Sequence, residues 1–195
     1  TGADTVRRHL YQLAVSEYPL QMIDAGDVII GETPDETYQN VKMVMEWFLG
    51  QQILPILIGG SQDITIGQYA GYEFLGQAVN LMVIDERVDL DDTELLPPGR
   101  TWLQQIFRYD PKFLFNYSAI AYQTHFNSPE MLGAIDDLLF DTIRLGRLKE
   151  NIQFAEPEVR DADILSIDIG AIRGADAPGI AHATPNGLSG WEICQ

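Results

Sequence analysis

Short runs of isoleucine, leucine and valine recur along the sequence and alternate with segments in which apolar residues follow helical spacing. Continuous apolar strands are typical of a parallel sheet that helices bury on both faces. The sequence therefore predicts an α/β fold, a three-layer α/β/α sandwich around a mainly parallel sheet. The expected strands are residues 24–31, 53–58, 79–84, 117–122 and 164–169.

Two helices are expected in the first part of the chain. Residues 4–16 carry apolar side chains at helical spacing. A second helix is expected to begin at Pro34, because proline suits the first helical position and Asp35 and Glu36 place acids in the first turn. Gly50 is expected to end it.

Polar segments stand at the ends of three expected strands, in residues 59–63, 85–89 and 166–170. Ligands of open parallel sheets bind beyond the carboxyl ends of the strands, so one site built from three strand ends is expected. Gly59 and Gly60 favour a tight turn rather than a phosphate cradle, because the lysine and hydroxyl residue of a P-loop do not follow them.

Charge and cysteine content exclude several classes of partner. The 195 residues include 12 Lys and Arg against 29 Asp and Glu, a formal net charge of −17. Such a chain is repelled by nucleic acid and by anionic membranes, so neither is expected as a partner. The one cysteine, Cys194, excludes an internal disulfide and is compatible with the reducing cytosol, so a cytoplasmic protein is expected.

The three polar segments resemble motifs of the ureohydrolase family, which comprises arginase, agmatinase and formimidoylglutamase. Residues 59–63, Gly-Gly-Ser-Gln-Asp, stand where the family has Gly-Gly-Asp-His-Ser. Residues 85–89, Asp-Glu-Arg-Val-Asp, stand for Asp-Ala-His-x-Asp, and residues 166–170, Ser-Ile-Asp-Ile-Gly, stand for Ser-x-Asp-x-Asp. Residues 120–129 are most similar to the formimidoylglutamase branch.

The resemblance covers residues 2–195 and implies an arginase-like fold. We expect residues 1–195 to form a single ureohydrolase-like domain that is a fragment, incomplete at both ends, because intact family domains are longer. Family members usually form trimers or hexamers, so a homo-oligomer is compatible with the resemblance, whereas no natural ligand or partner can be named.

Active family members hold two manganese ions, which activate a water for attack on a guanidinium or formimidoyl carbon. Carried over by motif, the ligands of the first ion would be Gln62, Asp85, Asp89 and Asp168, and those of the second would be Asp85, Arg87, Asp168 and Gly170. Arginine has no acceptor and glycine has no side chain, so the second site is expected to be absent. The expected function is that of a pseudoenzyme with a binding or regulatory role, with no catalytic residue and no cofactor.

Two further hypotheses concern the charge of this cluster. Converging carboxylates need a cation or a proton, and we expect the Arg87 guanidinium to take the place of the second metal and to pair with Asp85 or Asp168. The alternative is one manganese or magnesium ion on the oxygen ligands of the first site. In that case the chain would be a formimidoylglutamase-like hydrolase of C–N bonds in linear amidines.

Two more residues are candidates for contact with a substrate. His125 follows an expected strand, and Arg100 could bind a substrate carboxylate in the formimidoylglutamase-like case. The alternatives are a hydrogen-bonded loop histidine and a solvent-facing arginine at a helix start. The acids Asp91, Asp92 and Glu94 are expected to lie in a solvated loop.

Overall fold

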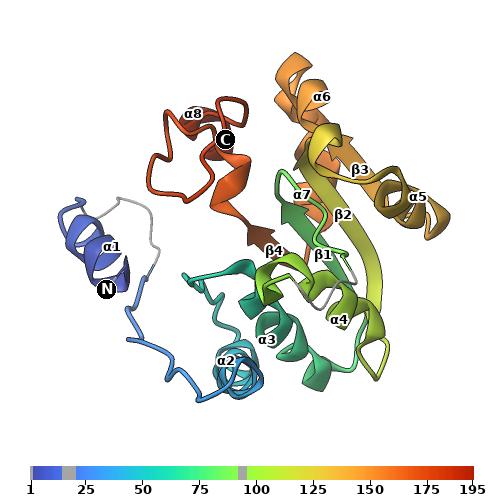
Figure 1. Cartoon of the computed structure of the whole chain (residues 1–195). Coiled ribbons are helices and arrows are strands. Elements are labelled where there is room, and N and C mark those ends of the chain that lie inside the picture. The colour runs from blue at the N-terminus through green and yellow to red at the C-terminus, as the bar shows by residue number, and fades with distance from the viewer. Residues whose placement is uncertain (1, 15–20, 92–95) are drawn as a thin grey trace.

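The computed structural model describes residues 2–14, 21–91 and 96–195. Its centre is a four-stranded, all-parallel sheet with the strand order β3-β2-β1-β4 (Figure 1). The strands are β1 (Val79–Ile84), β2 (Leu114–Tyr122), β3 (Asp141–Arg144) and β4 (Ile164–Ile167). The prediction of an α/β fold with a parallel sheet is therefore confirmed.

Helices surround this sheet and connect its strands. The α-helices are α1 (Gly2–Leu10), α2 (Pro34–Gly50), α3 (Thr65–Ala70), α4 (Trp102–Arg108), α5 (Pro129–Asp137), α6 (Leu145–Glu150), α7 (Glu156–Asp161) and α8 (Gly190–Ile193). Short 3₁₀ helices are η1 (Gln62–Ile64), η2 (Glu73–Leu75), η3 (Pro98–Arg100), η4 (Thr124–Phe126), η5 (Ile152–Ala155) and η6 (Ile169–Ala171). In the described part of the chain, no helix has both the length and the apolar character that crossing a bilayer requires.

Successive residues of β1 pack into different hydrophobic clusters, because side chains along a strand alternate between its faces. Leu81 and Val83 join the larger cluster with residues of α2, α3 and α4. Met82 joins the smaller cluster with Leu145 and Leu148 of α6. The sheet is thus covered on both faces, as a three-layer sandwich requires.

Helix α2 begins and ends where the sequence predicts. The Thr33 hydroxyl accepts a hydrogen bond from the backbone N–H of Glu36 at 3.2 Å, and Pro34 opens the first turn. The N-cap satisfies one of the backbone donors that a helix start leaves unpaired. Tyr38, Val41 and Met45 are then buried on one face, which fixes α2 against α3.

Two predicted strands, residues 24–31 and 53–58, are wrong: the structure has no strand in either range. Leu54 and Ile56 are 81% and 82% exposed, and Ile30 is 82% exposed. A strand needs a hydrogen-bonded neighbour, and in the described sheet β4 is an edge strand whose outer side has no partner. The apolar composition of these runs favours burial, but it does not indicate whether a neighbouring strand is present for them to pair with.

The first predicted helix is also shorter than expected. Helix α1 ends at Leu10, and the last two residues of the predicted range, 15 and 16, lie outside the described residues. No residue of α1 is buried, and Figure 1 shows it apart from the sheet. An ion pair from Arg7 Nε to Asp24 Oδ2, 2.8 Å long, connects α1 to the following segment.

Candidate functional site

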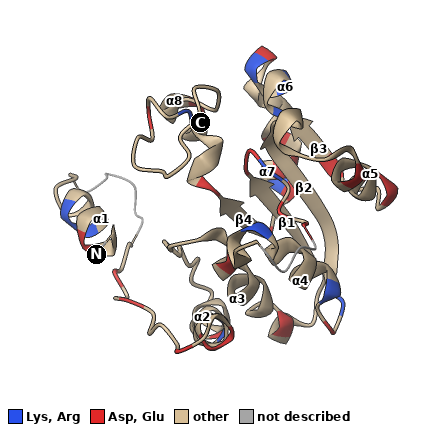
Figure 2. Ribbon diagram, in the orientation of Figure 1, with Lys and Arg blue, Asp and Glu red and all other residues tan. Residues whose placement is uncertain are grey.

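The carboxyl ends of β1 and β4 bring Asp85 and Asp168 to the same edge of the sheet. Ile84 and Ile167 are partners in the parallel register, and each aspartate directly follows one of them. The backbone N–H of Asp168 donates to the carbonyl of Ile84 at 2.9 Å, and that of Asp85 donates to Ile120 at 3.0 Å. Because both strands run in the same direction, their polar ends meet, and Figure 2 shows acidic and basic residues side by side in the loop after β1.

Asp85 and Asp89 form a buried pair of carboxyl groups. Their side chains are hydrogen-bonded to each other, and both residues are at most 5% exposed. Burial, reinforced by the charges of Asp89 and Asp168, raises the pKa of Asp85 well above its usual range. The hydrogen bond between the two carboxyl groups needs one proton, and burial favours the neutral form of Asp85.

Arg100 and Trp102 each contact a different oxygen of the Asp89 carboxylate. The Arg100 Nε atom lies 3.1 Å from Asp89 Oδ1, and the Trp102 indole Nε1 donates to Asp89 Oδ2 at 3.2 Å. Burial raises the pKa of Asp89, while the positive charge of Arg100 opposes this shift. Arg100 thus lies at a helix start, as the alternative had it, but its side chain is 36% exposed and pairs with Asp89 instead of facing only solvent.

Gln62 and Asp168, the remaining candidates for the first metal, each make a hydrogen bond to another residue of the motifs. The Gln62 side chain donates from Nε2 to Ser166 Oγ at 3.2 Å, while its Oε1 atom is buried without a hydrogen-bond partner. Asp168 Oδ1 accepts a 2.6 Å hydrogen bond from the backbone N–H of Gly170. Asp168 therefore caps η6 in this structure.

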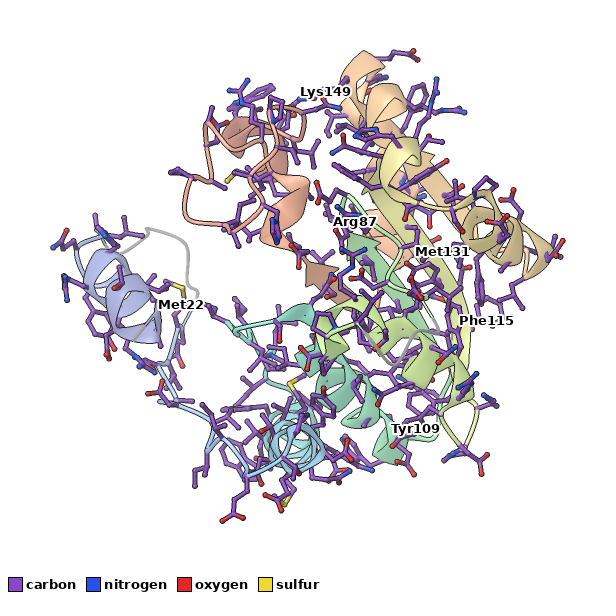
Figure 3. The ribbon with its side chains drawn as sticks, viewed as in Figure 1. Met22, Arg87, Tyr109, Phe115, Met131 and Lys149 are labelled. Carbon is purple, nitrogen blue, oxygen red and sulfur yellow. The ribbon has the colours of Figure 1, made fainter. Side chains whose placement is uncertain are left out.

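Arg87 does not make the ion pair that the sequence hypothesis assigned to it. Its Nε atom lies 3.3 Å from Glu86 Oε1, and its guanidinium carbon lies 4.1 Å from the centre of the Phe126 ring (Figure 3). The expected pairing with Asp85 or Asp168 is therefore wrong. The extended backbone that it assumed ends at Ile84, and Asp85 Oδ1 accepts instead from the backbone N–H of Arg87 at 3.0 Å.

Glu86 is a member of this cluster that the sequence analysis missed. It is 7% exposed, and its Oε2 atom is buried without a hydrogen-bond partner. A Cβ atom added to Gly170 would lie 3.7 Å from Glu86 Cγ, so this acid stands beside the glycine that replaces a family aspartate. The signal was present in the sequence, because Glu86 occupies the alanine position of the Asp-Ala-His-x-Asp motif.

The other candidates lie at the surface or outside the described residues. His125 is exposed on η4, and its ring centre lies 4.2 Å from that of Phe126. Asp91, expected in a solvated loop, is partly buried, and Asp92 and Glu94 lie outside the described residues.

These residues do not fit the two-manganese centre that the resemblance implies. Arg87 and Gly170 offer no side-chain ligand atom, and Asp89 is ion-paired with Arg100. Among residues 2–14, 21–91 and 96–195, no group of three or more His, Cys, Asp or Glu is arranged to hold a metal ion.

Curated relatives of this chain are formimidoylglutamases. The chain is 27% identical over 177 residues to the enzyme of Geobacillus kaustophilus (strain HTA426), and 28% identical over 179 residues to that of Geobacillus thermodenitrificans (strain NG80-2). Each alignment covers 85% of this chain and 54% of the relative. The chain thus spans about half the length of these relatives.

Solved structures share the fold. Trypanosoma cruzi formiminoglutamase with Mn2+2 superposes with a TM-score of 0.83 at 18% identity, covering 98% of this chain and 69% of that one. Formimidoylglutamase from Bacillus subtilis gives 0.83 at 19% identity, covering 98% and 66%. The arginase family model matches residues 1–195, so the chain belongs to the arginase family.

Proposed function

We propose that this chain is a formimidoylglutamase-like member of the arginase family that has lost dinuclear manganese hydrolysis and has a binding or regulatory role. The observation that carries the proposal is the side-chain chemistry at the second-metal positions. There the chain has Arg87, which is a cation, and Gly170, which has no side chain. Neither can ligate a divalent ion, whereas two-metal hydrolysis needs both ions to hold and activate the attacking water.

The surrounding contacts support this proposal. The Asp89 carboxylate is ion-paired with Arg100, a cation of the chain itself, and its other oxygen accepts a hydrogen bond from Trp102. A metal ligand needs a lone pair directed at the ion, so these contacts compete with a metal ion for Asp89.

The second candidate is a hydrolase of linear amidines that works with one metal ion. Three buried oxygen atoms of the cluster without hydrogen-bond partners favour it, and they are Gln62 Oε1, Glu86 Oε2 and Asp89 Oδ1. A carboxylate and an amide oxygen are hard ligands of the kind that manganese and magnesium prefer. Such an ion would have to compete with the Arg100 guanidinium before it could use Asp89.

Calorimetric titration of chelator-stripped protein with manganese and with magnesium tests both candidates. We expect no binding heat and no bound metal in the dialysed protein. One ion per chain would favour the single-metal hydrolase, and assays with formimidoyl and guanidino substrates would follow. Two ions per chain would refute the proposal, because the assignment of Arg87 and Gly170 to the second site would then be incorrect.

A further inference from the structure

We infer that Arg100 is the built-in counter-cation of the carboxylate cluster and that it keeps divalent metal ions away from Asp89. The inference rests on the proposed loss of the metal centre and names the residue that replaces one ion. It differs from the sequence hypothesis, which gave such a role to Arg87. In the structure Arg87 contacts Glu86 and Phe126 instead.

Each carboxylate oxygen of Asp89 has a neighbour from this segment, although Oδ1 is held by an ion pair without a hydrogen bond. Arg100 Nε lies 3.1 Å from Oδ1, and Trp102 Nε1 donates to Oδ2 at 3.2 Å. The Asp89 side chain is 3% exposed, so water contributes little to its solvation. A metal ion at this carboxylate would have to expel the guanidinium or accept it as a neighbour of like charge.

The segment that carries Arg100 is held in place by backbone contacts. The backbone N–H of Arg100 donates to the Pro97 carbonyl at 2.8 Å within the turn of η3. The backbone N–H of Leu103 donates to the Asp89 carbonyl at 3.3 Å. Arg100, Trp102 and Leu103 therefore all bind the same residue, so the guanidinium is positioned by the fold.

Close packing connects this segment to the first-metal turn as well. A Cβ atom on Gly99 would lie 3.4 Å from Ser61 Cβ and 4.0 Å from Asp63 Oδ1. Gly99 thus brings η3 against the turn that holds Gln62. The segment that carries Arg100 thus contacts both the turn of Gln62 and, through the guanidinium, Asp89.

The test compares manganese binding by the 195-residue chain and its variants after chelator treatment. Arg100→Met removes the charge and adds no hard ligand. Arg160→Met is the matched control, because Arg160 is 65% exposed and pairs with the exposed Glu156. We expect Arg100→Met to bind one manganese ion per chain, and the original chain and the control to bind manganese at least about 100-fold more weakly.

A second variant locates the gained ion. Asp89→Asn combined with Arg100→Met is expected to lose the manganese binding again. If this double variant binds as tightly as Arg100→Met, the ion lies elsewhere and the inference is overturned. If Arg100→Met does not fold alone, we expect manganese in the refolding buffer, or the added Asp89→Asn substitution, to restore folding. If neither restores it, the inference is overturned.

The remaining outcomes separate this inference from the proposed function. If neither the original chain nor Arg100→Met binds manganese, the role of Arg100 is refuted while the loss of the metal centre stands. If the original chain binds one ion with Arg100 in place, the role of Arg100 is refuted as well. Two ions in the original chain would refute both proposals.

Discussion

The Gln62 side chain donates a hydrogen bond from Nε2 to Ser166 Oγ at 3.2 Å and so joins the turn before α3 to β4. Gln62 stands where active family members have a metal-ligating histidine. Its amide group is held in the cluster, yet its Oε1 atom has no hydrogen-bond partner. The backbone N–H groups of the other two substituted positions, Arg87 and Gly170, bind Asp85 and Asp168. Reversing all three substitutions tests the motif alignment.

We expect the triple substitution Gln62→His, Arg87→His and Gly170→Asp to create manganese binding at the second-metal positions, whose ligands do not include Asp89, so that Arg100 keeps its ion pair. A Cβ atom at residue 170 would lie 2.8 Å from Asp168 Oδ1, so Asp168 must release its bond to the Gly170 backbone and becomes free to ligate. Metal content after dialysis is the measurement. The control makes the same exchanges at three exposed positions, Gln153→His, Arg160→His and Gly179→Asp. If the variant at residues 62, 87 and 170 stays metal-free, the motif alignment is wrong.

The ion pair between Lys149 and Glu192 is expected to make part of the stability pH-dependent. Lys149 Nζ lies 2.6 Å from Glu192 Oε2, and Ser189 also donates to this carboxylate. Partial burial opposes ionisation of Glu192, but the bonds from Lys149 and Ser189 outweigh it and lower its pKa to about 2.

A lowered folded-state pKa stabilises the protein above the unfolded-state pKa of about 4.3, and this contribution is lost as the pH falls towards 2. Glu192→Gln should therefore lower the free energy of unfolding by about 1 kcal/mol at pH 7, and the difference should vanish towards pH 2. Denaturant unfolding at several pH values measures it. A difference that stays constant from pH 7 to pH 2 would contradict the assignment.

Leu103 tests the packing of α4 against the sheet. It is 0% exposed within the larger hydrophobic cluster, so Leu103→Ala should destabilise the protein by about 2–5 kcal/mol. Leu54, which is 81% exposed, is the matched control, and Leu54→Ala should change stability by less than about 0.5 kcal/mol. Equal losses in the two variants would mean that residues 53–58 are buried in solution.

Exposed apolar runs beside the edge strand are expected to make this 195-residue chain bind hydrophobic dyes and associate with itself. Ile56 is 82% exposed, and Ile167 of β4 is 46% exposed on an unpaired edge. Ile56→Lys with Ile167→Lys should reduce both effects in dye fluorescence and light scattering. The control is Met43→Lys, which adds a charge on the exposed side of α2 and should leave dye binding and self-association unchanged.

Several features of the fold could be predicted from local sequence. Strand β1 has the predicted bounds, and α2 begins at Pro34 and ends at Gly50 as expected. These elements are set by apolar runs and by capping residues, which act over a few positions. The runs at residues 24–31 and 53–58 have similar composition, but whether they form strands depends on neighbours far away in the chain.

The sequence by itself determined which ligand types are present, because side-chain chemistry does not depend on folding: Arg87 and Gly170 cannot hold a metal ion. The tertiary structure alone decided which cation lies beside which carboxylate. It placed Arg100 against Asp89 and Arg87 against Glu86, since the chain turns after Ile84 and η3 packs on the turn at residues 59–63. Such pairings follow from how separate segments meet in space, and residue spacing along one strand carries no information about them.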